Sequence, residues 1–373
     1  MSDRMTPIPF GQLVNWIFSE FQRSKTVFGI PSVKFFHKSS PNVTRVFGEA
    51  IETPLGPAAG PHTQLAQNII ASYLAGGRFF ELKTVQHLDD LAIEKPCIDA
   101  QDEGYNVEWS QELTLSQSYE EYLKAWFALH LLNDVIHLSP LDKGGFIFNM
   151  SVGYTLDGIK TEKMNAFIDA LKDASSHSLF SNLKSIVKEQ TRRGILSHFI
   201  EGEGARKQFV QKIDGISPFI AKSVTLSTMH GCPPDEIEAI AKYLIREKGL
   251  HTYVKLNPTL LGYDAVKDIL ESLGYRYIAL ERESFMHDLQ FSDAVQMIER
   301  LKDFSAAHKK EFGIKLSNTL GVTNTRHVLS GGQMYMSGRS LFPVTINLAY
   351  KLAERSEERR VGKECRSRWS PYH

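Results

Sequence analysis

The stretch "VTLSTMHGCPPDEIEAI" at residues 224–240 joins two different patterns at a single cysteine. The apolar run before Cys232 predicts a short buried strand. The segment after it predicts a helix, since prolines and two acids precede apolar residues at helical spacing. Cys232 therefore stands where a strand passes into a helix. It could be a packed small residue, a metal ligand or an acid/base group at the mouth of an active site.

The rest of the chain repeats this alternation of strand and helix. Further predicted strands lie at residues 54–60, 78–85, 145–153, 251–259, 275–283 and 312–321. Predicted helices lie at residues 64–75, 118–135, 162–174, 178–193, 234–248, 263–273, 291–308 and 341–354, and residues 201–208 are predicted as a surface loop. Strands separated by helices indicate a parallel sheet. With seven candidate strands and no G-x-G-x-x-G at a helix start, we expect an α/β fold of the (β/α)8 TIM-barrel type.

The composition is that of an ordinary globular protein and excludes several classes. The 43 basic residues equal the 43 acidic ones, so no nucleic acid or anionic membrane surface is indicated as a partner. The three cysteines form no C-x-x-C pair, which leaves no zinc or iron–sulfur site visible and favours a reducing compartment. No apolar run approaches the ~20 residues of a membrane span. We therefore expect a cytoplasmic protein without a signal peptide.

The C-terminal stretch "RSEERRVGKECRSRWSPYH" breaks the pattern from Arg355 onward. It has no periodicity and is rich in arginine, as in translated adapter or cloning sequence. We expect residues 1–354 to form the barrel domain and residues 355–373 to be an unstructured tail. The barrel would then be truncated after its sixth strand unit, and the natural chain would continue beyond about Glu354.

Polar side chains gather at the predicted strand ends, where the chemistry of a (β/α) barrel is located. The first strand ends in the small residues Ala58, Ala59 and Gly60. Later strands end in Lys83 and Thr84, Asn149 and Ser151, Ser227 and Thr228, Lys255 and Asn257, and Asn318 and Thr319. Amides, hydroxyls and lysines suit a planar, partly anionic ligand such as a flavin, since a lysine beside N1 and O2 would stabilise the reduced ring. None of these strand ends has metal-ligand spacing, so no metal site is predicted.

Each of these residues also has a purely structural interpretation. Asn149 and Asn318 could cap loops, the small residues of the first strand could serve packing, and His230 fits a structural loop residue best. Cys232 taken alone is more typical of a buried small side chain. Lys255 differs because it lies between Val254 and Leu256 in an apolar strand, where a lysine is unusual.

The order of the motifs resembles a known family. "TPLGPAAG" followed by "LAGGRFFELKTV" resembles the dihydroorotate dehydrogenase-like flavoprotein barrels, and "LKTV" is similar to the flavin domain of dihydropyrimidine dehydrogenase. "YVKLNPT", "LSNTLG" and "MSGRSLFPVTINLA" follow in that family's order. From Pro7 to Glu354 the chain resembles the N-terminal part of the selenate reductase subunit family. Those are long bacterial flavoproteins with downstream iron–sulfur and FAD/NADPH regions.

This resemblance implies an FMN-dependent oxidoreductase domain that acts on a small molecule and exchanges electrons with downstream iron–sulfur, FAD and NADPH domains. The residues it places at FMN are Ala58, Ala59, Gly60, Lys83, Thr84, Asn149 and Lys255. Asn318 and Thr319 would bind substrate. Cys232 would be the general acid that exchanges a proton with a substrate carbon while a hydride passes to or from the flavin. A thiol of ordinary pKa, ~8.5, is mostly protonated at neutral pH, and a helix N-terminus beside it would stabilise the thiolate.

Two features of the sequence leave alternatives open. Residues 275–283 are either a barrel strand or an insertion, and no stretch matches the phosphate-binding loops that follow the seventh and eighth strands of such barrels. A non-redox lyase with a Schiff base on Lys83 or Lys255 is a second interpretation. A scaffolding barrel without activity is a third.

Overall fold

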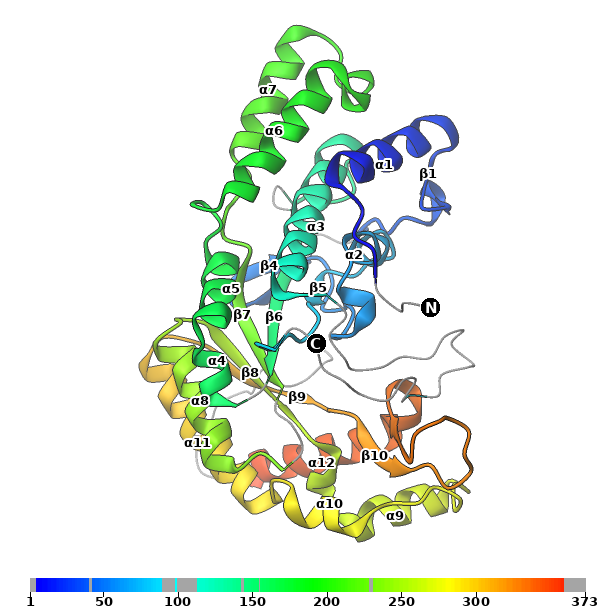
Figure 1. Cartoon of the computed structure of the whole chain (residues 1–373), viewed down its shortest axis with the longest axis vertical. Coiled ribbons are helices and arrows are strands. Elements are labelled where there is room, and N and C mark those ends of the chain that lie inside the picture. The colour runs from blue at the N-terminus through cyan, green and yellow to red at the C-terminus, as the bar shows by residue number, and fades with distance from the viewer. Residues whose placement is uncertain are drawn as a thin grey trace.

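A parallel sheet of five strands forms the centre of the structure (Figure 1). The computed structural model describes residues 5–39, 42–88, 98, 113–141, 144–153, 155–227 and 231–358. The strands follow one another in chain order: β5 (Phe79–Glu81), β6 (Ile147–Gly153), β7 (Ala221–Ser227), β8 (His251–Leu256) and β9 (Phe312–Leu316). Helices separate them, as the alternating sequence pattern predicts.

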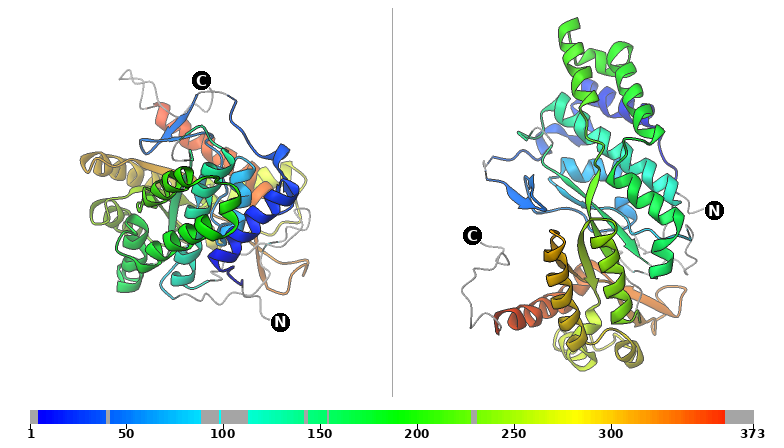
Figure 2. Two further views of the ribbon diagram at one scale, coloured as in Figure 1. Left: turned by 90° about the horizontal axis from the view of Figure 1, so that it is seen from above. Right: turned by 90° about the vertical axis from the view of Figure 1, so that its left-hand side faces the viewer.

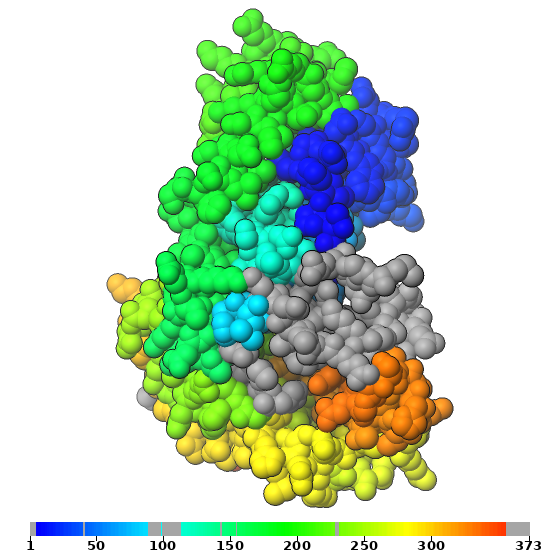
Figure 3. Space-filling model, in the orientation of Figure 1, coloured from blue at the N-terminus to red at the C-terminus, as the bar shows by residue number. Residues whose placement is uncertain are grey.

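The helices surround this sheet and extend beyond both of its ends (Figures 1 and 2). They are α1 (Phe10–Ser24), α2 (Ala66–Leu74), α3 (Leu115–Ile136), α4 (Leu156–Lys160), α5 (Glu162–Lys172), α6 (Ser178–Arg193), α7 (Glu203–Asp214), α8 (Pro234–Arg246), α9 (Tyr263–Ser272), α10 (Arg282–His287), α11 (Phe291–Ala307) and α12 (Phe342–Glu358). In the space-filling view α6 and α7 (green) form one end of the elongated molecule, and the α9–α10 region (yellow) forms the other (Figure 3).

Three antiparallel hairpins complete the described structure. They pair β1 (Thr26–Val27) with β2 (Ile30–Pro31), β3 (Thr44–Val46) with β4 (Glu49–Ile51), and β10 (Leu320–Thr323) with β11 (Gln333–Met336). Phe47, in the turn of the second hairpin, stacks on His251 at the start of β8, with 4.7 Å between the ring centroids. This hairpin therefore covers the N-terminal end of the strands, opposite to the end where polar residues gather.

The sheet has one apolar face and one polar face. Phe148, Met150, Val152, Val224 and Leu226 are at most 1% exposed and pack into the hydrophobic core. Trp126 of α3 lies 5.4 Å from Phe148, which shows that α3 covers part of this face. Alternate residues of a strand point to opposite faces, so the residues between these apolar ones, such as Asn149 and Thr225, share the other face.

The sheet is strongly curled toward its polar face. Glu81 in β5 forms an ion pair with Lys315 in β9, although three strands lie between them. In a flat sheet four strand spacings of about 4.8 Å would separate the two backbones by about 19 Å, which the two side chains cannot span. The polar face is therefore the inner face of a half-barrel.

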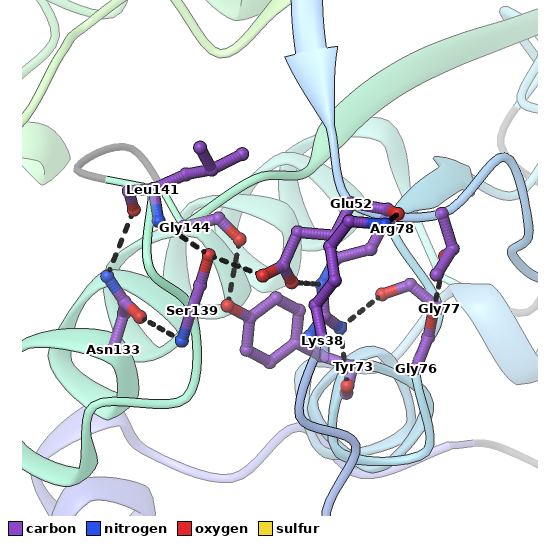
Figure 4. Close-up of polar contacts among 11 residues, drawn as sticks. Lys38, Glu52, Tyr73, Gly76, Gly77, Arg78, Asn133, Ser139, Leu141 and Gly144 are labelled. Atoms are coloured by element: carbon purple, nitrogen blue, oxygen red, sulfur yellow. Dashed lines mark hydrogen bonds and ion pairs between the residues drawn. The ribbon is translucent and has the colours of Figure 1, made fainter. Parts of the chain in front are cut away.

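A buried polar cluster fixes the start of β5 (Figure 4). Arg78 and Glu52 form an ion pair in which both side chains are fully buried. The Arg78 guanidinium also donates to the carbonyl oxygen of Tyr73 (2.7 Å) and lies over the Tyr73 ring, 3.9 Å from its centroid. Glu52 accepts a second hydrogen bond from the Ser139 hydroxyl at 2.9 Å. The cluster thereby connects the end of β4, the end of α2 and the loop after α3.

Most predicted elements are confirmed, one is wrong, and one open alternative is decided. Residues 275–283 are an insertion and not a strand of the sheet, since Ala279 makes one isolated bridge to Thr323 and α10 begins at Arg282. Residues 201–208 are not a loop, because α7 begins at Glu203 after Gly202, whose φ of 85° suits only glycine readily. Two glycines near the start of this short polar segment, Gly202 and Gly204, made the helix look like a loop.

For two further predicted elements the structure differs in extent from the prediction. The backbone of residues 55–57 runs beside β5, since the carbonyl oxygens of Leu55 and Pro57 accept from Phe79 and Glu81. Prolines lack an N–H group, so this segment cannot complete a ladder. Helix α12 runs to Glu358, past the predicted boundary at residue 354. Residues 359–373 lie outside the described structure, and the predicted tail stays a prediction. Across the described ranges no helix is both long and apolar enough to cross a membrane.

The Arg78 cluster gives the first testable prediction. Replacing Arg78 with methionine leaves the Glu52 carboxylate buried without its cation, so the free energy of unfolding should fall by about 3–5 kcal/mol. The matched control is Arg193→Met, which breaks an exposed ion pair with Glu189 and should cost less than about 1 kcal/mol. Urea unfolding followed by circular dichroism measures both. Equal, small effects of the two substitutions would contradict the structural role of the buried pair.

Candidate active site at the strand ends

Strand register places the predicted site residues on the inner face at two different levels along the strands. Glu81 lies beside Asn149, Ser227 beside Lys255, and Lys255 beside Lys315. Glu81, Ser227, Lys255 and Lys315 lie toward the C-terminal ends of their strands. Asn149 is level with Ser223 and His251, four residues before the level of Lys255. That Asn149 and Lys255 belong to one site stays a prediction.

Glu81 and Lys315 are a pair that the sequence prediction did not include. Glu81 accepts from both the Lys315 ammonium and the backbone N–H of Ala59 (3.0 Å), and only 4% of the residue is exposed. Lys315 lies between Ile314 and Leu316, which is the same signal that singled out Lys255. Applying that criterion to every strand would have found it.

Two lysines of the inner face have lowered pKa values. Burial, which disfavours the charged ammonium, lowers the pKa of Lys255 to about 8 and that of Lys315 to about 7. The Glu81 carboxylate opposes the shift at Lys315, because it stabilises the ammonium. His62, which follows the first predicted strand, also has a lowered pKa, mainly through burial and partly through the charges of Lys83 and Lys315. The inner face thus concentrates cationic groups that are partly removed from water, since the Lys315 side chain remains 22% exposed.

Lys83 and Thr84 follow the end of β5, and Asn149 lies beside that end in the neighbouring strand β6. Lys83 is 3% exposed, and its ammonium donates to the carbonyl oxygen of Thr84 at 3.3 Å. The Thr84 and Ser151 hydroxyls are 2.7 Å apart, and the Asn149 amide donates to Thr225 Oγ1 at 2.8 Å. Within the described residues, the buried Asn149 Oδ1 has no hydrogen-bond partner. A buried acceptor normally has one, so this oxygen is a candidate to receive a ligand's N–H group.

The ends of β7, β8 and β9 are joined by a chain of amides. The Asn318 side chain donates to Asn257 Oδ1 (2.8 Å) and accepts from the Ser227 hydroxyl (3.2 Å). Its backbone N–H also donates to the carbonyl oxygen of Leu256. Thr319 follows it and is half-buried. The two predicted substrate-binding residues are thus held at the strand ends.

Asp288 extends this chain to the cysteine loop. Its carboxylate accepts from Asn257 (3.3 Å), from the Thr259 hydroxyl (2.8 Å) and from the backbone N–H of Gly231 (2.5 Å). The sequence prediction missed Asp288, because it followed a segment taken as a strand that in fact leads into α10. Thr228 and His230 lie outside the described residues.

Cys232 is half-buried, and its Sγ lies 3.9 Å from Glu236 Oε2. Burial, reinforced by the negative charge of Glu236, raises the pKa of this thiol to about 12. The expectation that the helix N-terminus stabilises a thiolate is therefore wrong, because an acid in the first turn of α8 has the opposite effect. Glu236 is itself held by the backbone N–H of Leu156 at 3.1 Å. The thiol therefore keeps its proton at neutral pH.

Some small residues of the first predicted strand allow close packing, and others are exposed where a ligand could approach. A side chain on Gly56 would place its Cβ 1.6 Å from the carbonyl oxygen of Phe79, so this glycine serves close packing. Ala58 is exposed, whereas the Ala59 N–H is already bound to Glu81 and the buried Gly60 bonds with Thr63. Of the three predicted residues, Ala58 is the exposed one, and its backbone makes a hydrogen bond with His62. Within the described ranges no group of three or more His, Cys, Asp or Glu residues is placed to hold a metal ion.

Fold and comparisons define the class as a TIM-barrel domain of an oxidoreductase. A model of the family "Oxidoreductase YgfK, N-terminal TIM-barrel domain" matches residues 28–360, and the chain belongs to this family. It is 51% identical over 357 residues to the oxidoreductase YgfK of Escherichia coli K12 and, equally, to that of E. coli O157:H7. These matches cover 95% of this chain and 34% of each relative, so the chain spans about a third of the length of these relatives.

Two solved structures of a DHODH from Eimeria tenella are also similar. The ligand-free form has 15% identity and a TM-score of 0.38, over 82% of each chain. The complex with ferulenol has 12% identity and a TM-score of 0.37, over 94% of this chain and 96% of that one.

The lowered pKa of Lys255 predicts a pH-dependent stability. Its folded pKa of about 8 lies below the unfolded value of ~10.4, so between these values the unfolded chain binds more protons. The free energy of unfolding should therefore rise with pH in that window, by up to about 1.4 kcal/mol per pH unit, relative to a Lys255→Met variant. Denaturant unfolding between pH 7 and pH 10 measures the difference. In the exposed control Lys267→Met, the free energy of unfolding should change with pH as it does in the wild type. The same pH dependence in Lys255→Met as in the wild type would contradict the lowered pKa.

The Cys232–Glu236 contact predicts the reactivity of the thiol. Alkylation of Cys232 by iodoacetamide should be slow and should still accelerate above pH 10, because the thiolate is the reactive form. Glu236→Gln removes the negative charge and should shift the profile to lower pH, while Glu247→Gln at the end of the same helix should not. Mass spectrometry of the peptide 223–242, in which Cys232 is the one cysteine, gives the rate. A wild-type profile that levels off near pH 8.5 would contradict the raised pKa.

Proposed function

We propose that the chain is the FMN-binding domain of a multidomain oxidoreductase, and that Cys232 is its general acid. The observation that carries this proposal is the set of lysines and amides on the inner face and at the carboxyl ends of a five-stranded parallel sheet. Parallel α/β sheets bind ligands at the carboxyl ends of their strands. Cationic and amide groups without a metal cluster suit an anionic, planar, hydrogen-bonding ring system better than they suit a metal-dependent hydrolase.

The residues present fit a flavin ring. The unpartnered Asn149 Oδ1 can accept from a ring N–H, and the Asn149 position lies between Glu81 and Ser223 in the sheet. Lys83 and Lys255 supply positive charge in a dry environment, where electrostatic stabilisation is strongest. Ala58 offers an exposed backbone for close approach, and Thr84 offers a hydroxyl. Bound FMN would take up or deliver a hydride at its N5 position.

The chain's own residues supply the proton and the orientation. Reduction of a C=C or C=N bond adds one hydride and one proton, and the Cys232 thiol is the proton donor in this proposal. A thiol with a pKa of about 12 keeps its proton in water and gives it up only to a strongly basic centre. A substrate carbon that gains negative charge is such a centre. The Asn318 amide and Thr319 hydroxyl would hold the polar edge of the substrate beside it.

The wider assignment follows from the length of the relatives and from the sequence resemblance. About two thirds of each E. coli relative lies outside the region matched by this chain. We propose that this remainder carries the iron–sulfur, FAD and NADPH-binding domains of the selenate reductase subunit family. Electrons would then pass between them and FMN at the strand ends.

The lowered lysine pKa values also suit the lyase alternative, since a neutral amine is the nucleophile that forms a Schiff base. Membership in an oxidoreductase family weighs against it. Treatment with borohydride in the presence of pyruvate distinguishes the oxidoreductase from the lyase. Covalent trapping of pyruvate on Lys255 or Lys83 would establish the lyase. The scaffolding alternative would gain support if Cys232→Ser and Lys255→Met left every activity of the full-length protein unchanged.

The test of the proposal is flavin binding by the full-length protein. Purified protein should release about one FMN per chain on denaturation. Lys83→Met and Lys255→Met should each weaken FMN binding roughly tenfold, and Lys255→Met should make the FMN midpoint potential more negative, because it removes charge that stabilises the reduced ring. Cys232→Ser should leave FMN affinity unchanged. The exposed Lys267→Met is the control, and a full-length protein that binds no FMN would overturn the proposal.

A further inference from the structure

We propose that Asp288 is the positioning residue that holds the Cys232 loop against the ends of β7, β8 and β9. The inference rests on the proposed function, because it concerns the residue proposed as general acid. Asp288 itself lies on neither a strand nor a predicted motif. It follows α10, in the connection between β8 and β9.

The carboxylate of Asp288 collects donors from two separate segments. Oδ1 accepts from the backbone N–H of Gly231, the residue directly before Cys232. Oδ2 accepts from Asn257 and Thr259, which follow β8. The residue is only 4% exposed. A charged acceptor shared by a backbone amide, a hydroxyl and a side-chain amide makes stronger hydrogen bonds than a neutral one would.

Hydrogen bonds from Gln290 and the packing of α10 hold Asp288 in position. Gln290 donates to the carbonyl oxygen of Asp288 at 2.7 Å and to that of Phe285 at 3.0 Å. Phe285 of α10 is buried and lies edge-on to Tyr263 of α9, with 5.5 Å between the ring centroids. Asp288 therefore follows a helix that is packed against α9, so its carboxylate can hold the loop in a stable position.

The anchored loop carries the Cys232 thiol at its end. Gly231 has a φ of 78°, so the chain turns sharply just before Cys232, and the Asp288 contact holds this turn. Through Asn257 the same carboxylate is linked to Asn318, the proposed substrate ligand. Asp288 thus sets the position of the proton donor relative to the groups that would hold the substrate. Its effect on the reaction would be through Cys232 and Asn318, without contact with the reacting atoms.

The experiment uses Asp288→Asn in the full-length protein and measures alkylation of Cys232 by iodoacetamide at pH 8. Asparagine keeps the size but loses the charge and one acceptor, so the loop should loosen and the thiol should leave its burial and its contact with Glu236. We expect alkylation at least tenfold faster than in the wild type, with the rate profile shifted to lower pH. Asp288→Glu should recover part of the slow rate.

The control is Asp264→Asn. Asp264 is an exposed residue of α9, and its carboxylate pairs with Arg282 of α10, the helix that precedes Asp288. This substitution should leave the alkylation rate unchanged. If Asp288→Asn lowered the melting temperature but left the rate and its pH profile unchanged, Asp288 would be a structural support only, and the inference would be overturned.

A second measurement keeps the inference testable if the variant fails to fold. The Gly231 N–H of the wild-type protein should be protected in hydrogen exchange, and fast exchange there would overturn the inference. Flavin content is measured on the same samples. Absence of FMN from the wild type would count against the proposed function alone, because thiol alkylation and amide exchange do not depend on flavin.

Discussion

The curl of the central sheet is the constraint on which the rest of the structure depends. It brings Glu81 of the first strand within contact of Lys315 of the fifth, across a face that would otherwise be too wide for any side chain to span. The same curl converts a row of strand residues into a concave site. Apolar side chains such as Met150 and Val224 cover the other face and pack beneath the helices. One alternation of polar and apolar residues therefore determines both the core and the site.

Burying lysines on the inner face has an energetic cost that explains their chemistry. Desolvation disfavours the ammonium form of Lys255 and Lys315, and Glu81 is the carboxylate seen to pair with Lys315. An anionic ligand at the strand ends would offset this cost by supplying negative charge. Cys232 shows the converse effect, because burial beside Glu236 keeps its thiol protonated. The inner face thus provides positive charge, and Cys232, in the loop between β7 and α8, retains its proton. In the proposed function these are the two elements that hydride transfer with protonation requires.

The sequence predicted the fold well where local patterns coincide with burial. The strand before Cys232 and the helix after it lie at β7 and α8, because apolar spacing is set by which face is buried. It failed at residues 201–208, where glycines imitate a loop. It left residues 275–283 open between a strand and an insertion, because alternating tyrosines imitate a strand. Hydrogen-bond partners that are distant in the chain also could not be predicted from the sequence. Asp288 meets Gly231 across 57 residues, and the sign of the Cys232 pKa shift depends on how Glu236 is oriented in α8.

The central claim is that the lysines of the inner face meet FMN, and lysine labelling in the flavin-free and FMN-saturated full-length protein tests it most directly. At pH 8 an acylating reagent should modify Lys255 faster than the exposed Lys267 in flavin-free protein, because only neutral amines react and the pKa of Lys255 is about 8. FMN should suppress labelling of Lys255 and leave Lys267 unaffected. Equal labelling of Lys255 with and without saturating FMN would contradict the account.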